Sequence, residues 1–596
     1  MFILLSILII VLETIYLLSF YKLFHSSRIR IINEGTMILF FSICYMHSGL
    51  ADSITMESIV FMLITALLLT SLSIVLVGIF EYQFGLLLFS LINALIYIGS
   101  SIKMNTTGVP VMWADFNSGL FWDVVWNMYL KQNYPYIILS FVIVVLLFYF
   151  MHTKKISILT FQTRMRQILI GGIGLVTILV LVGKVFVTTV HSRSFEEQGS
   201  LVYFISSREV DAMSSSGILN QYSQEKMEKI VKKYEEEFST KKNFGKDDET
   251  VITVLSESLA DPKSFSGISW KEDPMPNFRK LQNASGGYLQ STMFGGGTTN
   301  VEFSVLTGFS YSFFNQQINA FDYMNQNPDR NQSIAQYKGD NIAIHTHMKT
   351  GYHRADVLPN LGFSKFTGRE DLLKMEETSS AVYYAEGYLS DYTLFDQILN
   401  EVSSSTEKNL LVHGLSMQNH YPYTEDLKGK LENKDVLISG NNLNAEQKQL
   451  ALYARGVKKT DEALGTFIQS LEALDRNVTV IMYGDHYPAL DNSVYMKYPV
   501  KSDENKLIND HSTPYFVWKN HNRKSENVSK SVTPEGLAVL AMKEGNTKVP
   551  VFYQFVGKLE KVDKETSIHQ EMLEDYELIQ YDMLEGEQYS KVLFEK

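Results

Sequence analysis

The spacing of apolar residues divides the chain into two unlike halves. Over the first 190 residues long apolar segments dominate, and most of them approach the roughly 20 residues that a helix needs to cross a bilayer. These segments lie at residues 2–21, 33–50, 57–80, 84–102, 134–152 and 168–189. The pattern predicts a multi-span helical membrane domain over residues 1–190. The number of helices is five or six, because polar residues interrupt the second segment.

Basic residues between these segments predict their orientation. They gather in the loop after the first segment and in the loop between the fifth and the sixth. The residues concerned are Lys22, Arg28, Arg30, Lys154, Lys155, Arg164 and Arg166. Because Lys and Arg are retained on the cytoplasmic side of a membrane, we expect both loops inside the cell and everything after about residue 190 outside it.

Residues 103–133 form a separate aromatic segment. Trp113, Trp122 and Trp126 are three of the chain's five tryptophans, and apolar residues such as Phe121 surround them. Tryptophan favours the headgroup layer of a membrane, so the segment predicts an in-plane helix on the outer leaflet. A loop packed on the following domain is the alternative.

After residue 248 the pattern changes to short apolar runs that alternate with helix-like stretches. The runs are VITVLSE, NIAIHTH, NLLVHGLS, VTVIMYG and TPYFVWK. Buried runs that alternate with helices indicate an α/β domain with a mostly parallel sheet, which we place at residues 249–596. The charged stretch QEKMEKIVKKYEEEF is typical of a solvated helix and belongs to a helical connector at residues 191–248.

Polar side chains follow three of these predicted strands. Glu257 ends the first run, His420 follows the third, and Asp485 and His486 follow the fourth. Ligands of parallel sheets bind beyond the carboxyl ends of the strands, so we expect these side chains to meet. Oxygen and nitrogen donors without a thiolate suit Mn²⁺, Mg²⁺ or Zn²⁺. The sequence therefore predicts a site for one divalent cation.

Thr298 is the candidate nucleophile. Three glycines precede it, which lets the backbone approach a phosphate closely. Thr299 and Glu302 fit a capping box, so a helix should begin here and offer its free N–H groups to an anion. Beside a cation, the Thr298 hydroxyl could attack phosphorus. A glycine turn followed by an ordinary cap is the alternative.

Other polar residues are candidates for phosphate recognition. Arg354 is the best phosphate clamp because a guanidinium binds phosphate through two parallel hydrogen bonds, although a surface salt bridge is the alternative. His420 could bind the phosphate or protonate a leaving alkoxide. His345 and His347 alternate along one run and so face the same way, whereas His413 fits a core position.

Composition narrows the classes of partner. The net charge of −12 weighs against a nucleic-acid partner. The single cysteine, Cys44, excludes a disulfide or a multi-cysteine zinc site within the chain. A sulfatase would need Cys or Ser in a C/S-x-P-x-R context, and the sequence contains neither form of that motif.

The motifs SESLAD, GGGTTNVEFSVLTG, YHRADVLPNLGF, QNHYPY and YGDHYP, in this order, closely resemble those of lipoteichoic acid synthases. These are membrane glycerophosphotransferases of Gram-positive bacteria within the alkaline phosphatase and sulfatase superfamily. The resemblance implies that the metal ligands, usually of manganese, are Glu257, Thr298, Asp485 and His486. It also implies that Thr298 is the nucleophile and that the glycerophosphate head is held by His420, Arg354 and His345.

The resemblance further implies a reaction and a location. Glycerol phosphate would move from phosphatidylglycerol, through a Thr298 ester, to a growing polyglycerolphosphate chain or a glycolipid anchor, and diacylglycerol would be released. The catalytic domain would lie outside the cell membrane. Two residues depart from the family pattern: Tyr352 stands where tryptophan is expected, and His347 where an acid is expected. They leave the acceptor open, so a glycerophosphate or phosphoethanolamine transferase that decorates another cell-surface glycan or lipid, or a non-catalytic membrane sensor, are the alternatives.

Overall fold

The computed structural model describes most of the chain. Its described residues are 27–50, 56–80, 82–107, 111, 160–184, 200–206, 213, 217–238, 248–315, 318–376, 382–440, 442–501, 509–526 and 528–595. The chain forms two compact units, Met1–Asp211 and Ala212–Lys596. Each unit has its own packing and is described by itself.

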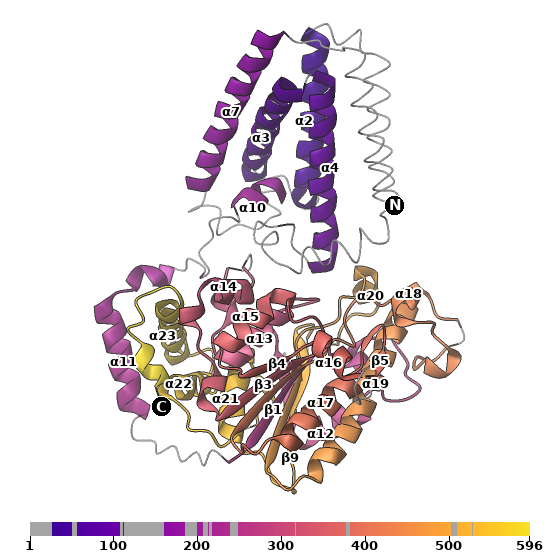
Figure 1. Ribbon diagram of the computed structural model, residues 1–596, viewed down its shortest axis with the longest axis vertical. Coiled ribbons are helices and arrows are strands. Elements are labelled where there is room, and N and C mark those ends of the chain that lie inside the picture. Colours follow the sequence, from indigo (N-terminus) through magenta and orange to yellow (C-terminus); the bar gives the residue numbers. More distant parts are fainter. Residues whose placement is uncertain are drawn as a thin grey trace. The chain divides into compact units, whose positions relative to one another are not determined.

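The first unit consists of helices (Figure 1). They are α2 (Ser27–Leu50), α3 (Met56–Phe80), α4 (Tyr82–Thr107), α7 (Phe161–Lys184) and the short α10 (Ser200–Ser206). Helix α7 packs closely on α3 at Gly171, where an added Cβ would lie 3.0 Å from the Ser71 carbonyl oxygen.

These helices cover four of the six predicted membrane segments. The segments at 2–21 and 134–152, and most of the aromatic segment at 103–133, lie outside the described residues. Among the described residues, one helical stretch, Ile59–Phe80, is long and apolar enough to cross a membrane. The multi-span membrane domain therefore stays a prediction.

The second unit is built around an eight-stranded sheet of order β10-β2-β9-β8-β1-β7-β3-β4. Its strands are β1 (Thr250–Ser256), β2 (Gly286–Gln290), β3 (Asp340–His345), β4 (Lys365–Thr367), β7 (Leu410–Leu415), β8 (Val478–Gly484), β9 (Ser512–Lys519) and β10 (Ser531–Val532). The five strands from β8 to β4 are parallel, whereas β9 runs antiparallel to both β8 and β2. The predicted α/β domain with a mostly parallel sheet is thus confirmed.

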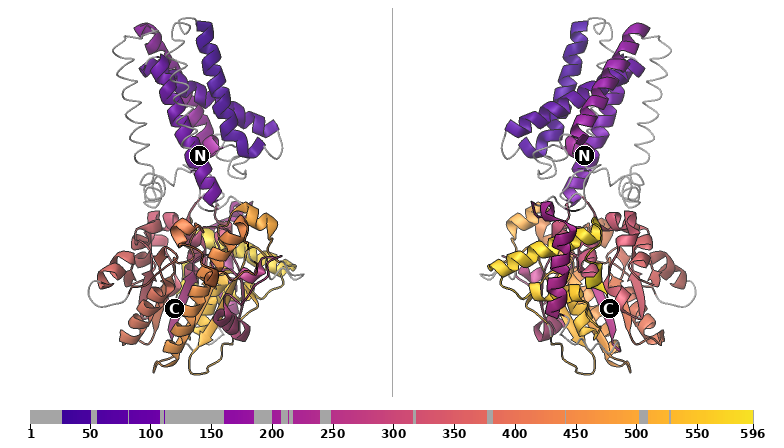
Figure 2. Two further views of the ribbon diagram at one scale, coloured as in Figure 1. Left: turned by 90° about the vertical axis from the view of Figure 1, so that its right-hand side faces the viewer. Right: turned by 90° about the vertical axis from the view of Figure 1, so that its left-hand side faces the viewer.

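Helices cover both faces of this sheet (Figures 1 and 2). Along β1, Val251 and Leu255 pack into one apolar core and Ile252 and Val254 into the other, which explains the unbroken apolar run. The helices of the first core are α11 (Gln224–Phe238), α13 (Thr298–Thr307), α14 (Ala320–Gln326), α15 (Arg354–Asn360), α21 (Pro534–Glu544), α22 (Val551–Leu559) and α23 (Ser567–Leu584). Those of the second are α12 (Pro276–Ser285), α17 (Asp391–Ser404) and α19 (Ala445–Glu472).

Smaller elements complete the unit. They are α16 (Arg369–Glu376), α18 (Glu425–Lys428), α20 (Asn492–Lys497) and a hairpin of β5 (Tyr384–Ala385) and β6 (Tyr388–Leu389). Helix α11, from the stretch expected to be a solvated connector, buries Ile230 and Tyr234 in the first core, against the rest of the second unit. The Tyr234 hydroxyl also donates a hydrogen bond to Asp575 on α23 at 2.8 Å.

Candidate active site

The four residues expected to bind the cation lie together at the carboxyl edge of the sheet. Glu257 follows β1, and Asp485 and His486 follow the adjacent β8. The strand register pairs Ser256 with Gly484, so the two acidic residues leave neighbouring strands side by side. Thr298 is the first residue of α13.

Short distances join these side chains. The Thr298 hydroxyl donates a hydrogen bond to Glu257 Oε2 at 3.1 Å and lies 3.3 Å from His486 Nε2. His486 Nε2 is 3.2 Å from Asp485 Oδ2 and 3.7 Å from Glu257 Oε1. One donor atom each from Glu257, Asp485 and His486 lies within 4.8 Å of the others, which is the spacing that one cation could bridge.

Hydrogen bonds with the backbone leave one donor atom of Asp485 and one of His486 available. The N–H groups of Ser258 and His486 donate to Asp485 Oδ1 at 2.8 and 2.9 Å, and His486 Nδ1 lies 2.8 Å from the Tyr487 carbonyl oxygen. A carbonyl can only accept, so Nδ1 carries the proton and Nε2 keeps its lone pair. Asp485 Oδ2 is buried and accepts no hydrogen bond within the described residues.

The electrostatics of the cluster favour a bound cation. Burial, with the neighbouring Glu257 charge, raises the pKa of Asp485 to about 7 despite the opposing effect of His486. Burial also acts to raise the pKa of Glu257, but the charges of His420 and His486 lower it overall. The two buried carboxyl groups lie close together, and among the described residues Asp485 Oδ2 accepts no hydrogen bond, so a positive charge bound there would stabilise them. The oxygen and nitrogen donors present therefore fit a divalent cation.

The start of α13 differs from the expected capping box. Gly297, with φ of 84°, is the residue before the helix, and among the described residues no side chain caps it. The Thr299 hydroxyl instead accepts a hydrogen bond from Asn319, and Glu302 accepts two from Arg354. The capping-box prediction is wrong because a buried guanidinium binds the Glu302 carboxylate more strongly than a backbone N–H does.

His420 lies on the loop after β7. Its Nδ1 atom is 2.7 Å from the Tyr421 carbonyl oxygen, so Nδ1 carries the proton and Nε2 is left unprotonated in the neutral ring. Burial lowers the pKa of His420, although the Glu257 charge opposes this. The His420 charge in turn acts to lower the pKa of Glu257, so the two side chains interact electrostatically.

The remaining predicted residues form a second group. Arg354 is buried and paired with Glu302. Its Cζ lies 5.6 Å from the centre of the Tyr352 ring, and Tyr352 has a left-handed φ of 53°. The rings of His345 and His347 lie 6.0 Å apart. Burial lowers the pKa of both histidines, for His347 to about 4, and the Arg354 charge lowers them further.

The two groups are related through His347. Its pKa, which burial lowers most, also responds to the charges of His420, Arg354 and Glu257, so His347 interacts electrostatically with members of both groups. None of the hydrogen bonds described joins Arg354 to Thr298 directly.

Lys428 is a residue near the site that no sequence pattern indicates. Its ammonium group is buried and donates hydrogen bonds to the carbonyl oxygens of Gln418 and His420 at 3.1 and 2.7 Å. Burial lowers the pKa of Lys428 to about 8. The residue fixes the loop that carries His420, and no local pattern around position 428 indicates that contact.

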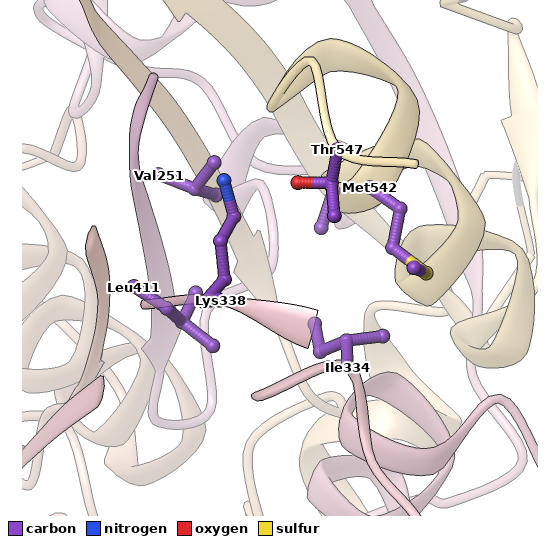
Figure 3. Close-up of a pocket in the computed structure, with 7 residues that line it drawn as sticks. Val251, Ile334, Lys338, Leu411, Met542 and Thr547 are labelled. Carbon is purple, nitrogen blue, oxygen red and sulfur yellow. The ribbon is translucent and has the colours of Figure 1, made fainter. Parts of the chain in front are cut away.

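A small cavity lies apart from these residues, beside β1, β7 and α21 (Figure 3). Its volume is about 10 Å³, which is room for no more than one water molecule. Lys338 reaches into it and donates hydrogen bonds to the carbonyl oxygens of Glu249 and Gly545 at 3.2 and 3.1 Å. This cavity is too small for a substrate.

Comparison with known proteins agrees with this fold. Residues 249–539 match the family model described as Sulfatase. A Rhizobium meliloti (strain 1021) protein named for the modification of cyclic beta-1,2-glucan is 28% identical over 376 residues, which cover 58% of this chain and 56% of that protein. The chain thus spans about half the length of this curated relative.

Two solved structures are also similar. Phosphoglycerol transferase GacH of Streptococcus pyogenes, in complex with sn-glycerol-1-phosphate, is 26% identical with a TM-score of 0.53, and the match covers 64% of this chain and 97% of GacH. The lipoteichoic acid synthase LtaP of Listeria monocytogenes is 16% identical with a TM-score of 0.41, over 61% of this chain and 98% of LtaP. The second unit is a sulfatase-like α/β domain, as the sequence predicted.

Proposed function

We propose that this protein is a glycerophosphotransferase that takes glycerol phosphate from phosphatidylglycerol and releases diacylglycerol. The observation that carries the proposal is the Thr298 hydroxyl, which begins α13 and lies within 3.3 Å of both Glu257 and His486. A hydroxyl at a helix start, among buried carboxylates, suits attack on phosphorus. The similarity to a phosphoglycerol transferase supports glycerol phosphate as the transferred group.

A divalent cation belongs to this proposal. Glu257, Asp485, His486 and the Thr298 oxygen would hold it, with Mn²⁺ as the first choice and Mg²⁺ or Zn²⁺ as alternatives. Bound there, the cation would polarise the phosphoryl oxygens and lower the pKa of the attacking hydroxyl.

The chain's own residues then account for a two-step transfer. Thr298 Oγ1 bonds to phosphorus, the bond from phosphorus to the diacylglycerol oxygen breaks, and the proton of the Thr298 hydroxyl passes to that oxygen. In the second step the acceptor hydroxyl attacks the phosphorus of the glycerophospho-threonine and gives its proton to the unprotonated His420 Nε2. The bond from phosphorus to Thr298 Oγ1 then breaks, and Thr298 takes up a proton, which restores the free hydroxyl. The N–H groups at the start of α13 stabilise the negative charge that develops on phosphate.

The acceptor has two candidates. A polyglycerolphosphate chain or glycolipid anchor, as in lipoteichoic acid synthesis at the surface of a Gram-positive cell, follows from the motifs. Decoration of a different cell-surface glycan is the second candidate, because the curated relative is named for glucan modification. His347 and Tyr352, beside Arg354, are the residues that we expect to tune the acceptor or headgroup.

The test uses the purified full chain with Mn²⁺ and phosphatidylglycerol labelled in its glycerol headgroup. Without an acceptor, mass spectrometry should find glycerol phosphate on Thr298, and diacylglycerol should appear. Thr298→Ala should abolish diacylglycerol release and transfer, whereas Thr298→Ser should retain part of both. Sustained transfer by Thr298→Ala would overturn the covalent step, and no diacylglycerol from the wild type would overturn the function.

A further inference from the structure

Arg354 is held along one edge by Glu302. Its Nε and Nη2 atoms donate hydrogen bonds to the same oxygen, Glu302 Oε2, at 3.0 and 2.8 Å. The guanidinium also lies near two rings, with its Cζ 5.6 Å from the centre of Tyr352 and 5.8 Å from that of Phe321. Its Nη1 atom makes only a 3.5 Å contact with the Gly351 carbonyl oxygen. The Nη1–Nη2 edge is therefore the one suited to a phosphate.

Glu302 is itself held in place by residues of the sheet. It is fully buried on α13, four residues after Thr298. Its Oε1 atom lies 3.6 Å from His413 Nε2, and His413 Nδ1 lies 2.8 Å from the Thr253 hydroxyl. Thr253 and His413 are direct partners across β1 and β7. The helix that carries the nucleophile thus also carries the anchor of Arg354, and both are tied to the centre of the sheet.

The pair also balances charge beside the candidate phosphate site. Burial acts to raise the pKa of Glu302, but Arg354 and His413 lower it overall, so the carboxylate is ionised and the pair is neutral. His347, close to Arg354, stays uncharged at neutral pH because burial lowers its pKa to about 4. A dianionic phosphate therefore meets less net positive charge here than an unpaired arginine would supply.

We propose that Glu302 positions Arg354 and, by balancing its charge, makes the site prefer singly charged phosphodiesters to dianionic phosphomonoesters. The inference rests on the proposed function, because it assumes that Arg354 meets the substrate phosphate. It adds a specificity role for a residue that touches no substrate. A phosphodiester such as phosphatidylglycerol carries one negative charge, whereas a monoester such as glycerol phosphate carries two at pH 8.

The experiment compares two constants at pH 8 for the purified full chain with Mn²⁺. They are the KM for diacylglycerol release from phosphatidylglycerol and the inhibition constant Ki of glycerol phosphate. Neither depends on the fraction of folded enzyme. Glu302→Gln removes one negative charge, so Ki should fall about tenfold and by a larger factor than KM, because a dianion gains more from the added positive charge than a monoanion does. Arg354→Met should raise Ki. In the double variant the two side chains again carry no net charge, so the ratio of Ki to KM should return toward the wild-type value.

The test includes a matched control variant and a further comparison in case one variant does not fold. Glu249 is also buried and paired with an arginine, Arg523, at 2.8 Å, but it precedes β1 at the opposite end of the strand. Glu249→Gln should leave both constants unchanged. If one single variant does not fold, the other compared with the double variant still gives the sign.

The outcomes separate the two proposals. Shifts of Ki in opposite directions for Glu302→Gln and Arg354→Met support the inference. Unchanged constants, or shifts in the same direction, overturn it while the proposed function stands. A wild-type chain that releases no diacylglycerol overturns the function, and the inference with it.

Discussion

At the scale of residues, the candidate cation site depends on which atom of each side chain the backbone leaves available. Two N–H groups occupy Asp485 Oδ1, and the Tyr487 carbonyl oxygen lies beside His486 Nδ1. Oδ2 and Nε2 then point to the same place, 3.2 Å apart. The ligands are thus oriented before any cation binds, which lowers the entropic cost of binding.

Replacement of Asp485 should therefore remove cation binding without unfolding the domain. Asp485→Asn keeps the shape but loses the charge and one lone pair, so we expect affinity for Mn²⁺ to fall about 100-fold or more, together with transfer. Titration calorimetry with Mn²⁺ measures the loss. The control is Asp475→Asn, an exposed residue before β8 at the other end of the same strand. Wild-type affinity in Asp485→Asn would contradict the ligand assignment.

At the scale of elements, helix α13 brings the nucleophile to the sheet edge through one glycine in a left-handed conformation. Gly297 has a φ of 84°, and a Cβ there would lie 2.0 Å from Met293 Cε. A side chain is disfavoured in this left-handed conformation by roughly 1–2 kcal/mol, before any clash. The direction in which Thr298 leaves the turn is therefore set by glycine at 297.

Alanine substitutions at Gly296 and Gly297 should show whether the left-handed conformation at 297 positions the nucleophile. Gly297→Ala should slow diacylglycerol release about tenfold or more, because the start of α13 must shift. Gly296→Ala is the matched control, since a Cβ at 296 would meet no atom within 4 Å and its φ lies outside the left-handed region. Equal rates for the two variants would show that the turn does not position the nucleophile.

Helix α21 offers a test of stability against pH. Burial, with the nearby Glu560 charge, raises the pKa of Glu535 from 4.5 to about 7. A carboxyl group whose pKa is raised on folding stabilises the fold below its unfolded pKa, and this contribution is lost as pH rises through about 7.

Glu535→Gln removes that titration. The variant should match the wild type near pH 5 and exceed it near pH 8 by about 1–3 kcal/mol in the free energy of unfolding. Urea unfolding at the two pH values measures the difference. A constant difference between the two proteins at both pH values would contradict the buried, protonated carboxyl group.

At the scale of the whole molecule, the two units suit different surroundings. The first contains the apolar stretch Ile59–Phe80, whereas the second has a sheet buried on both faces and a polar cluster at its edge. The phospholipid substrate that we propose would require the second unit to work at a membrane face. The positions of the basic residues predict that this is the outer face.

Cysteine labelling can test that orientation, because Cys44 is the chain's single cysteine. In a Cys44→Ala background, Met496→Cys places a thiol at a residue that is 85% exposed on the second unit. It should react with a membrane-impermeant maleimide in intact cells. Lys154→Cys, in a loop expected inside the cell, should react only after lysis. The reverse pattern would place the second unit in the cytoplasm.

The sequence by itself determined the α/β fold of the second unit and the place of its polar clusters. Each of these strands is followed directly in the sequence by its site residues, Glu257 after one and Asp485 and His486 after the other. A single local pattern therefore predicts both the strand and the polar residues at its end. Short strands such as β4 and β10 carry too few residues for such a pattern, and they were not foreseen.

The tertiary structure decided the contacts between distant segments. Arg354 could have met solvent, a phosphate or a carboxylate, and only the fold, in which α14 packs on both α13 and α15, brought it to Glu302. Lys428 likewise binds the His420 carbonyl oxygen through the fold of its loop. Burial penalises an unpaired charge wherever it lies along the chain. The partner of a buried charge is therefore the group that the fold places beside it. The residues next to that charge in the sequence do not predict this partner.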